Sequence, residues 1–215
     1  MATALPPHAG QPVLHRGRPL ADARAAVVMV HGRGASPQSI LSLVEAIGHP
    51  DVAYLAPAAV GGTWYPLGFM APIAQNEPGI SSGISVIHGL IDEVAAAGIP
   101  ESRIVLLGFS QGACLSGTAA QRRPRRYGGV AMLSGGLIGP PGTAWSTDGD
   151  FAGTPILLGC SDVDAHIPEV RVRESAAHLE RMGAAVTLRI YPGMGHQVNE
   201  DEIAWVNDLL HALAG

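Results

Sequence analysis

The sequence contains no lysine, only two cysteines, and few charged or aromatic residues. All 13 basic side chains among the 215 residues are arginine, 14% of residues are charged and 5% are aromatic. The formal net charge of −5 argues against a nucleic-acid partner, which would need a basic face. Two cysteines are too few for a disulfide scaffold. Cys114 and Cys160 both lie in apolar stretches, so we expect buried, reduced thiols.

Long hydrophobic runs are also missing from the sequence. The apolar stretches have the length of a strand, whereas a membrane-spanning helix needs about 20 apolar residues. The opening residues, MATALPPHAGQP, have neither the basic nor the apolar segment of a secretory signal. We therefore expect a cytoplasmic protein without stable membrane insertion. Residues 1–12 are predicted to be flexible, and residues 13–215 to form a single domain.

Short apolar runs alternate with helical patterns along the chain. Strands are predicted from runs rich in Val, Ile and Leu at 25–31, 52–57, 103–109, 128–135, 155–160 and 185–191. Helices are expected near 37–48, 80–97, 111–122, 168–182 and 200–213. Continuous apolar runs are typical of strands that are covered on both faces. The pattern predicts a three-layer α/β domain with a mostly parallel sheet flanked by helices, and such sheets bind ligands at the carboxyl ends of their strands.

The stretch VLLGFSQGACLSG at 105–117 places Ser110 between a buried strand and a helix of small residues. G-x-S-x-G in this context is the nucleophile elbow of α/β-hydrolases. Gly108 and Gly112 lack a Cβ atom, so the strand and the helix can approach closely at the turn. Ser110 is therefore the predicted nucleophile, and the backbone N–H of Gln111 is one predicted donor to an oxyanion.

A second oxyanion donor is expected in the loop after an early strand. The sequence His31-Gly32-Arg33-Gly34 ends the first long apolar run, and the Arg33 amide is the best candidate. The Arg33 side chain either faces solvent or contacts an anionic substrate group. His31 precedes the serine in the chain, so we expect it to pack and to shape the loop.

The acid and the base are expected after the serine, in the order Ser, Asp, His. Asp162 and Asp164 both follow the strand at 155–160 and compete for the role of acid. Asp164 lies further along the loop and is preferred, because Asp162 can cap the turn at the strand end. His196 lies in a Gly-rich loop directly after the last strand and is the predicted base. His166 is too near the acid in sequence to lie between it and Ser110.

The segment GTWYPLGFMAPIAQNEPG at 62–79 gathers apolar side chains in a loop punctuated by Gly and Pro. The loop either forms an acyl pocket beside Ser110 or packs into the core. The candidate substrate-binding residues are Trp64, Tyr65, Leu67, Phe69 and Met70. A second segment, the arginine-rich run at 122–126, is either a solvated helix end or a docking site for acidic lipid head groups.

Taken together, these motifs resemble the small carboxylesterase, lysophospholipase and acyl-protein thioesterase family of α/β-hydrolases, over nearly all of residues 24–213. The sequences HGRG, SDVDAHIP and YPGMGH stand where that family has its oxyanion, acid and histidine loops, and GIPESRIVLLGFSQGACLS resembles its approach to the nucleophile. The resemblance implies an α/β-hydrolase fold with no large cap domain, and it also favours Asp164 as the acid. The chemistry requires no metal and no organic cofactor, and no Cys/His spacing indicates one.

Two departures from the family pattern bear on the substrate. Ala35-Ser36 stands where thioesterase members carry an acidic residue, and Trp64-Tyr65-Pro66 stands where they have Trp-Phe-Asp. We therefore predict a serine carboxylesterase that hydrolyses short- to medium-chain acyl esters, from small molecules or lipids, through an acyl-serine intermediate. The alternatives are lysophospholipase or acyl-thioesterase activity, a dienelactone-type hydrolase, and a catalytically inactive binding protein. Because relatives of this type often pair, a homodimer is one expected state.

Overall fold

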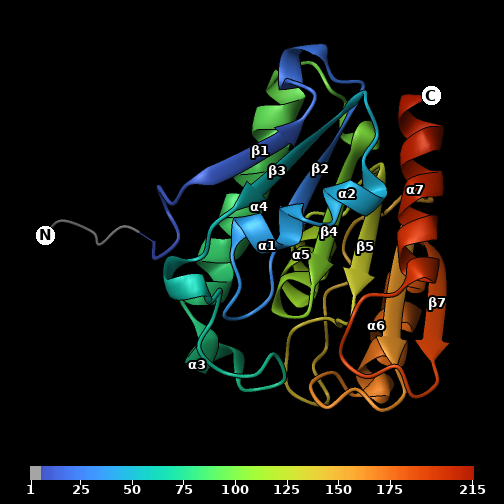
Figure 1. Cartoon of the computed structure of the whole chain (residues 1–215). Coiled ribbons are helices and arrows are strands. Elements are labelled where there is room, and N and C mark those ends of the chain that lie inside the picture. The colour runs from blue at the N-terminus through green and yellow to red at the C-terminus, as the bar shows by residue number, and fades with distance from the viewer. Residues whose placement is uncertain (1–5) are drawn as a thin grey trace, which may run out of the picture.

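The computed structural model describes residues 6–215 and is built around one twisted sheet (Figure 1). Within these residues the sheet has seven strands in the order β1-β3-β2-β4-β5-β6-β7. β1 pairs antiparallel with β3, and all other neighbours are parallel. The strands are β1 (Val13–Gly17), β2 (Ala25–Val30), β3 (Val52–Pro57), β4 (Ile104–Phe109), β5 (Gly129–Leu133), β6 (Pro155–Ser161) and β7 (Ala185–Tyr191).

The predicted mostly parallel sheet is confirmed, and β1 is an edge strand that the sequence pattern did not indicate. Its sequence, VLHRG, has only two apolar residues, and three of its five residues are exposed. Val13 and Leu14 are half-buried and pack against the two core clusters, whereas the other three residues lie outside the core, so the strand has no continuous apolar run. It is held by its pairing with β3, which is a contact between segments distant in sequence.

Helices cover both faces of the sheet, as expected for a three-layer domain. The helices are α1 (Pro37–Leu41), α2 (Val44–Ile47), α3 (Ile73–Asn76), α4 (Gly79–Ala96), α5 (Gln111–Arg122), α6 (Glu169–Arg181) and α7 (Glu200–Ala214). Buried residues of α4, α5 and α6 share one hydrophobic cluster, and those of α1, α2 and α7 share the other. The helix predicted near 37–48 is divided into α1 and α2, and the single-turn helix α3 was not predicted.

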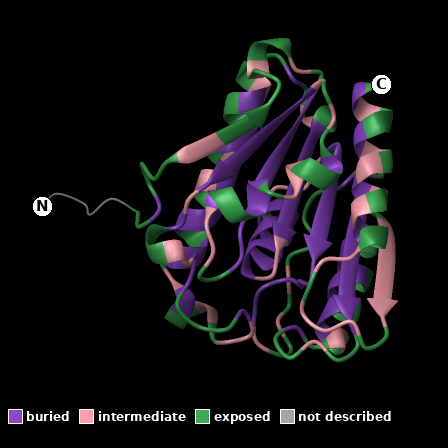
Figure 2. Cartoon of the chain, viewed as in Figure 1, coloured by how far each residue is buried: buried purple, intermediate pink, exposed green. Residues whose placement is uncertain are grey.

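The continuous apolar runs of the sequence are explained by this layering. In β2, alternate side chains point into the two clusters on opposite faces of the sheet, and all six residues are buried. Figure 2 shows the same burial along the central strands. A strand that is covered on both faces must be apolar at every position rather than at every second one.

The amino-terminal segment differs in part from the flexible stretch expected over 1–12. Residues 1–5 lie outside the described part of the chain. His8, however, is buried, and its ring lies 5.1 Å from the Trp64 ring, edge to face. Its Nδ1 accepts a hydrogen bond from the Val60 N–H (3.2 Å), and its Nε2 donates to the Trp64 carbonyl (2.8 Å). The segment around His8 is therefore packed against the domain.

Loops and the short helix α3 follow the carboxyl ends of the strands, and residues 6–215 contain no separate cap domain. None of the helices described is long and apolar enough to cross a membrane.

Candidate active site

Ser110 lies at a sharp turn between β4 and α5. Its backbone has φ 56° and ψ −119°, outside the region that residues with a side chain usually adopt. A Cβ atom on Gly108 would lie 2.3 Å from the Gly112 carbonyl oxygen, and one on Gly112 would lie 2.0 Å from the Val30 oxygen. Only glycine fits at both positions. The Ser110 N–H donates to the Leu133 carbonyl on the neighbouring strand (3.0 Å), which holds the turn against the sheet.

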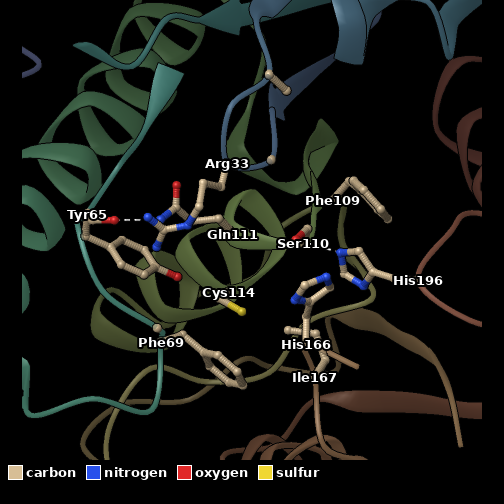
Figure 3. A pocket seen from close by; sticks show the side chains of 13 residues that line it. Arg33, Tyr65, Phe69, Phe109, Ser110, Gln111, Cys114, His166, Ile167 and His196 are labelled. Carbon is tan, nitrogen blue, oxygen red and sulfur yellow. Dashed lines mark hydrogen bonds between the residues drawn. The ribbon is translucent and has the colours of Figure 1, made fainter. Parts of the chain in front are cut away.

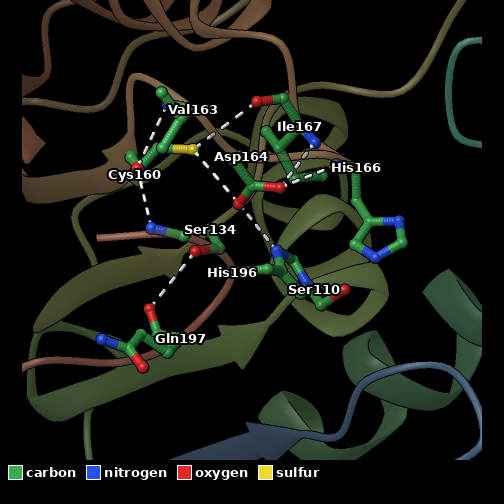
Figure 4. Close-up of polar contacts among 11 residues, drawn as sticks. Ser110, Ser134, Cys160, Val163, Asp164, His166, Ile167, His196 and Gln197 are labelled. Carbon is green, nitrogen blue, oxygen red and sulfur yellow. Dashed lines mark hydrogen bonds and ion pairs between the residues drawn. The ribbon is translucent and has the colours of Figure 1, made fainter. Parts of the chain in front are cut away.

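The loops after β4, β6 and β7 bring Ser110, Asp164 and His196 together (Figure 4). His196 Nε2 lies 2.8 Å from Ser110 Oγ, and His196 Nδ1 lies 2.7 Å from Asp164 Oδ2. The other carboxylate oxygen of Asp164 accepts hydrogen bonds from the N–H groups of His166 (2.8 Å) and Ile167 (3.0 Å). The acid is thus held in place by its own loop, and this chain of hydrogen bonds ends on the serine hydroxyl.

The two candidate acids have different partners. Burial by itself would raise the pKa of Asp164, but the hydrogen bonds from His196 and from the loop N–H groups outweigh it. The pKa of Asp164 therefore lies below its usual value, and the carboxylate stays ionised beside the imidazole. Asp162 instead accepts a hydrogen bond from the Gly193 N–H (2.8 Å) and so ties the acid loop to the loop that carries His196.

Two other histidines lie near the triad. His31 is buried; its Nδ1 donates to the Gly32 carbonyl (2.8 Å), and its Nε2 accepts from the Ala59 N–H (3.2 Å). Burial lowers its pKa despite the hydrogen bond to Gly32, so the ring is a neutral loop-shaping group. His166 places its ring 4.8 Å from the His196 ring at an interplanar angle of 69°. It therefore borders the site without lying between the acid and the serine.

Backbone groups around Ser110 come from the two elements expected to form an oxyanion hole. Gln111 begins α5, and the N–H groups in the first turn of a helix have no partner within the helix. Gly32 and Arg33 line the same hollow from the loop after β2. A Cβ atom on Gly32 would lie 3.4 Å from the Ser110 Cβ, so this loop passes directly beside the nucleophile.

Three polar side chains hold the loop at residues 63–69 through its backbone. Gln111 accepts a hydrogen bond from one loop N–H (2.9 Å) and donates to the Tyr65 carbonyl (2.8 Å), as Figure 3 shows in part. The Arg33 guanidinium donates to the next two carbonyls, at 2.8 and 2.5 Å. Buried Asn76 pairs with an N–H and a carbonyl further along. No motif in the sequence indicated these anchors, and the Arg33 side chain was expected either to face solvent or to contact an anionic substrate group.

A cavity of about 360 Å³ opens beside Ser110 and His196 (Figure 3). Its wall includes Tyr65, Phe69, Phe109, Cys114 and Ile167. One wall residue that was not predicted, Cys114, could have been found from its spacing to Ser110. Cys114 follows Ser110 by four positions in α5, and residues four apart share one face of a helix.

Of the five candidate substrate-binding residues, the structure brings only Tyr65 and Phe69 to this cavity. Trp64 is fully buried in the core, and its indole N–H donates to a backbone carbonyl just after β2 (2.9 Å). Leu67 is 41% exposed, and Met70 packs against the core cluster. The expectation for these three residues is therefore corrected. Neighbouring loop side chains point in different directions, so one loop contributes both to the pocket wall and to the core.

The arginine-rich run at 122–126 is engaged within the chain. Arg123 forms ion pairs with Asp92 and Glu101, and Arg125 pairs with Glu101. Arg126 donates to a backbone carbonyl near the start of β6. These contacts favour a structural role at the end of α5 over docking to acidic lipids.

The chain is similar to several known proteins. Residues 18–214 match the family described as Phospholipase/Carboxylesterase. A crystal structure of a phospholipase/carboxylesterase from Dyadobacter fermentans superposes with a TM-score of 0.89 and 40% identity, over 94% of this chain and 97% of that one. The predicted α/β-hydrolase fold is therefore confirmed.

Curated relatives match over shorter stretches. Acyl-protein thioesterase 1 of Gibberella zeae is 32% identical over 139 residues, which is 63% of this chain and 59% of its own length. A probable carboxylesterase of Oryza sativa subsp. japonica is 28% identical over 142 residues, 64% of this chain. The match spans about half, 53%, of the rice protein's length. On the match over residues 18–214, the chain belongs to the phospholipase/carboxylesterase family of α/β-hydrolases, a family of enzymes that act on ester bonds.

Proposed function

We propose that the protein is a serine carboxylesterase that hydrolyses short- to medium-chain acyl esters through an acyl-serine intermediate. The observation that carries this proposal is the hydrogen-bonded line from Asp164 through His196 to Ser110, with contacts of 2.7 and 2.8 Å. A serine hydroxyl becomes a nucleophile when an adjacent base takes its proton as it attacks. The strained turn directs the hydroxyl into the cavity where that attack would take place.

The first half of the reaction forms the acyl-enzyme. His196 Nε2 takes the Ser110 proton as Oγ bonds to the ester carbonyl carbon, and the carbonyl oxygen becomes an oxyanion. The N–H groups of Arg33 and Gln111 donate to this oxygen, and such a donor contributes about 3 kcal/mol in comparable sites. Asp164 holds the imidazole tautomer and stabilises its charged form. His196 then gives the proton to the leaving alkoxide as the bond between carbon and oxygen breaks.

The second half releases the acid. A water molecule gives a proton to His196 Nε2 and attacks the acyl carbonyl carbon, while the same backbone groups stabilise the oxyanion. The bond to Ser110 Oγ breaks, the proton passes from His196 to that oxygen, and the free carboxylic acid leaves. The water molecule is thus consumed, and Ser110 and His196 return to their starting protonation states.

The size and lining of the cavity support a short or medium acyl chain. A volume of about 360 Å³ lies toward the small end of ligand sites. Phe69, Phe109 and Ile167 supply apolar wall that an acyl chain can contact. Long-chain lysophospholipid and acyl-thioester substrates are the second candidate, because the fungal relative is named an acyl-protein thioesterase.

The test is an activity panel on the purified protein, with Ser110→Ala as the blank. The panel contains p-nitrophenyl esters from acetate to decanoate, a lysophospholipid and a long-chain acyl thioester. We expect Ser110-dependent turnover with the largest kcat/KM among the short and medium esters. A larger value for the lysophospholipid or the thioester would favour the second candidate. If no substrate is turned over and a fluorophosphonate probe does not label Ser110 in folded protein, the protein is a catalytically inactive binding protein.

A further inference from the structure

One polar atom in the pocket wall has no partner. Tyr65 is 2% exposed, and among residues 6–215 its hydroxyl has no partner at ordinary hydrogen-bond distance and angle. In Figure 3 the hydroxyl points toward the hollow that Ser110, Cys114 and Phe69 also border. The Cys114 thiol is its polar neighbour and interacts with it, but a thiol is a weak hydrogen-bonding group, and this contact lies outside ordinary hydrogen-bond geometry.

Four successive carbonyls of this loop are engaged, which makes the hydroxyl informative. The Tyr65 carbonyl accepts from Gln111, and the following carbonyls accept from Arg33 and Asn76. These hydrogen bonds hold the backbone around Tyr65 in place, and the phenol ring itself is buried. A buried polar group without a partner destabilises the fold, so such groups are rare in folded proteins. A phenylalanine in this place would fill the same space without that cost.

The surroundings indicate what kind of group the hydroxyl would bind. Burial raises the pKa of Tyr65 well above its usual value, so the phenol stays protonated and can donate. Burial also raises the pKa of the Cys114 thiol to about 12, so the thiol is neutral. The Arg33 guanidinium lies 6.0 Å from the Tyr65 ring and is bound to the loop carbonyls. The neutral Tyr65 and Cys114 side chains suit an uncharged acceptor, whereas the Arg33 guanidinium, which also lines the cavity, is directed to the loop carbonyls.

We propose that Tyr65 Oη and the pocket around it recognise an uncharged oxygen, such as an ether, keto or hydroxyl oxygen, in the acyl part of the ester. This inference rests on the proposed esterase function and narrows its substrate class. A site that presents a buried donor discriminates against an isosteric substrate without an acceptor, because the donor is then left unpaired. When an ester with an unsubstituted alkyl chain binds, the Tyr65 hydroxyl has no acceptor.

The experiment compares p-nitrophenyl hexanoate with analogues in which one chain methylene at a time is replaced by an ether oxygen. The measured quantity is the ratio of kcat/KM for each ether ester to that for the hexanoate. Each ratio is then divided by the ratio of the rates at which hydroxide hydrolyses the same two esters without enzyme. This correction removes the difference in their intrinsic reactivity. We expect the corrected ratio to exceed unity at one position of the oxygen. Tyr65→Phe should lower that ratio about tenfold, the effect of one neutral hydrogen bond.

Tyr54→Phe is the matched control. The Tyr54 side chain is also buried, but its hydroxyl accepts from the His49 N–H and donates to the Ile47 carbonyl, outside the cavity. This variant should keep the wild-type ratio. The urea concentration at the midpoint of unfolding gives a second readout. Tyr65→Phe should raise it because an unpaired buried group is removed, and Tyr54→Phe should lower it because two hydrogen bonds are lost. A hydroxyl with a purely structural role at Tyr65 would lower the midpoint instead.

The outcomes separate this inference from the proposed function. If the esters are hydrolysed in a Ser110-dependent way, but Tyr65→Phe keeps the wild-type ratio at every position, the Tyr65 inference is wrong and the esterase function stands. If the corrected ratio of the wild-type enzyme is unity at every position of the ether oxygen, the Tyr65 inference is also wrong. If no ester is hydrolysed in a Ser110-dependent way, both proposals are wrong.

Discussion

Ser110 shows how much of this site depends on the conformation of a single residue. A positive φ of 56° on a residue with a side chain costs on the order of 1–3 kcal/mol, and it persists only where surrounding contacts fix it. Here the contacts are the hydrogen bond to Leu133 and the close packing of Gly108 and Gly112. The strain has a direct use, since it projects the hydroxyl toward His196.

The roles of the two carboxylates can be separated by the same substitution at each. Asp164→Asn should lower kcat/KM by about 10³- to 10⁴-fold, because an amide does not stabilise the imidazolium and favours the wrong tautomer. Asp162→Asn keeps an oxygen that can accept from the Gly193 N–H, so its kcat/KM should stay within about threefold of wild type. Steady-state kinetics on p-nitrophenyl acetate measure both. A larger loss at Asp162 would reverse the assignment.

The first turn of α7 fixes the end of the loop that carries His196. Asn199 accepts from the Glu202 N–H, and the Glu202 carboxylate accepts from the Asn199 N–H, which forms a capping box. Glu202 is completely buried, and its second oxygen has no hydrogen-bond partner in the structure from residue 6 onward. A Cβ atom on Gly159 would lie 2.0 Å from that oxygen, so a side chain at this position of β6 would displace the carboxylate.

This buried carboxylate predicts a pH dependence of stability. Burial raises the pKa of Glu202 to about 7, from 4.5 in the unfolded chain. The folded state therefore binds the proton more tightly, and the free energy of unfolding falls as the pH rises between these values, by about 3 kcal/mol. Glu202→Gln cannot ionise. Its free energy of unfolding relative to wild type should increase from pH 5 to pH 8, as measured by urea denaturation.

Asp201, the neighbouring carboxylate, provides a control of opposite sign. Hydrogen bonds from Tyr191 and Arg189 lower the pKa of Asp201 below 3.8. The ionised carboxylate therefore stabilises the fold at neutral pH, and this contribution is lost as the pH falls below about 4 and the carboxylate is protonated. Asp201→Asn should be less stable than wild type at pH 6, and the gap should close toward pH 3. A flat difference curve for Glu202→Gln would show that this side chain does not titrate in the folded protein as argued.

At the scale of the whole molecule, the pocket wall is tied to distant parts of the chain by one buried arginine. Arg171 of α6 is 1% exposed and donates to the Leu137 and Gly139 carbonyls in the long connection between β5 and β6. The Gly139 N–H in turn donates to the Phe69 carbonyl (2.9 Å). The guanidinium also lies 5.1 Å from the Trp145 ring. Segments around residues 69, 139 and 171 are thus fastened together behind the cavity.

Replacing this arginine should destabilise the whole domain. Arg171→Met leaves two buried carbonyls without their donor, and we expect the free energy of unfolding to fall by about 2–4 kcal/mol. Arg173→Met is the matched control in the same helix, because Arg173 is exposed and, within residues 6–215, pairs only with Glu169. Its effect should stay below about 1 kcal/mol. Urea denaturation measures both, and equal losses would contradict the anchoring role of Arg171.

Much of this organisation could be predicted from the sequence, because its signals are local. Continuous apolar runs marked the parallel strands, and the glycines around Ser110 marked a turn that admits no Cβ atom. Since parallel strands place their carboxyl ends at one edge, the loops with Asp164 and His196 were expected to meet that serine. The structure brings the three side chains within hydrogen-bond distance.

The sequence by itself therefore determined the layered fold and which residues stand at the ends of its strands. Tertiary structure alone decided that β1 closes one edge, that Tyr65 faces the cavity while Trp64 faces the core, and that Gln111 and Arg33 hold the loop between them. The physical reason is the range of the interactions. Periodicity and backbone strain act over a few residues, whereas the direction of a loop side chain depends on partners that only folding brings near.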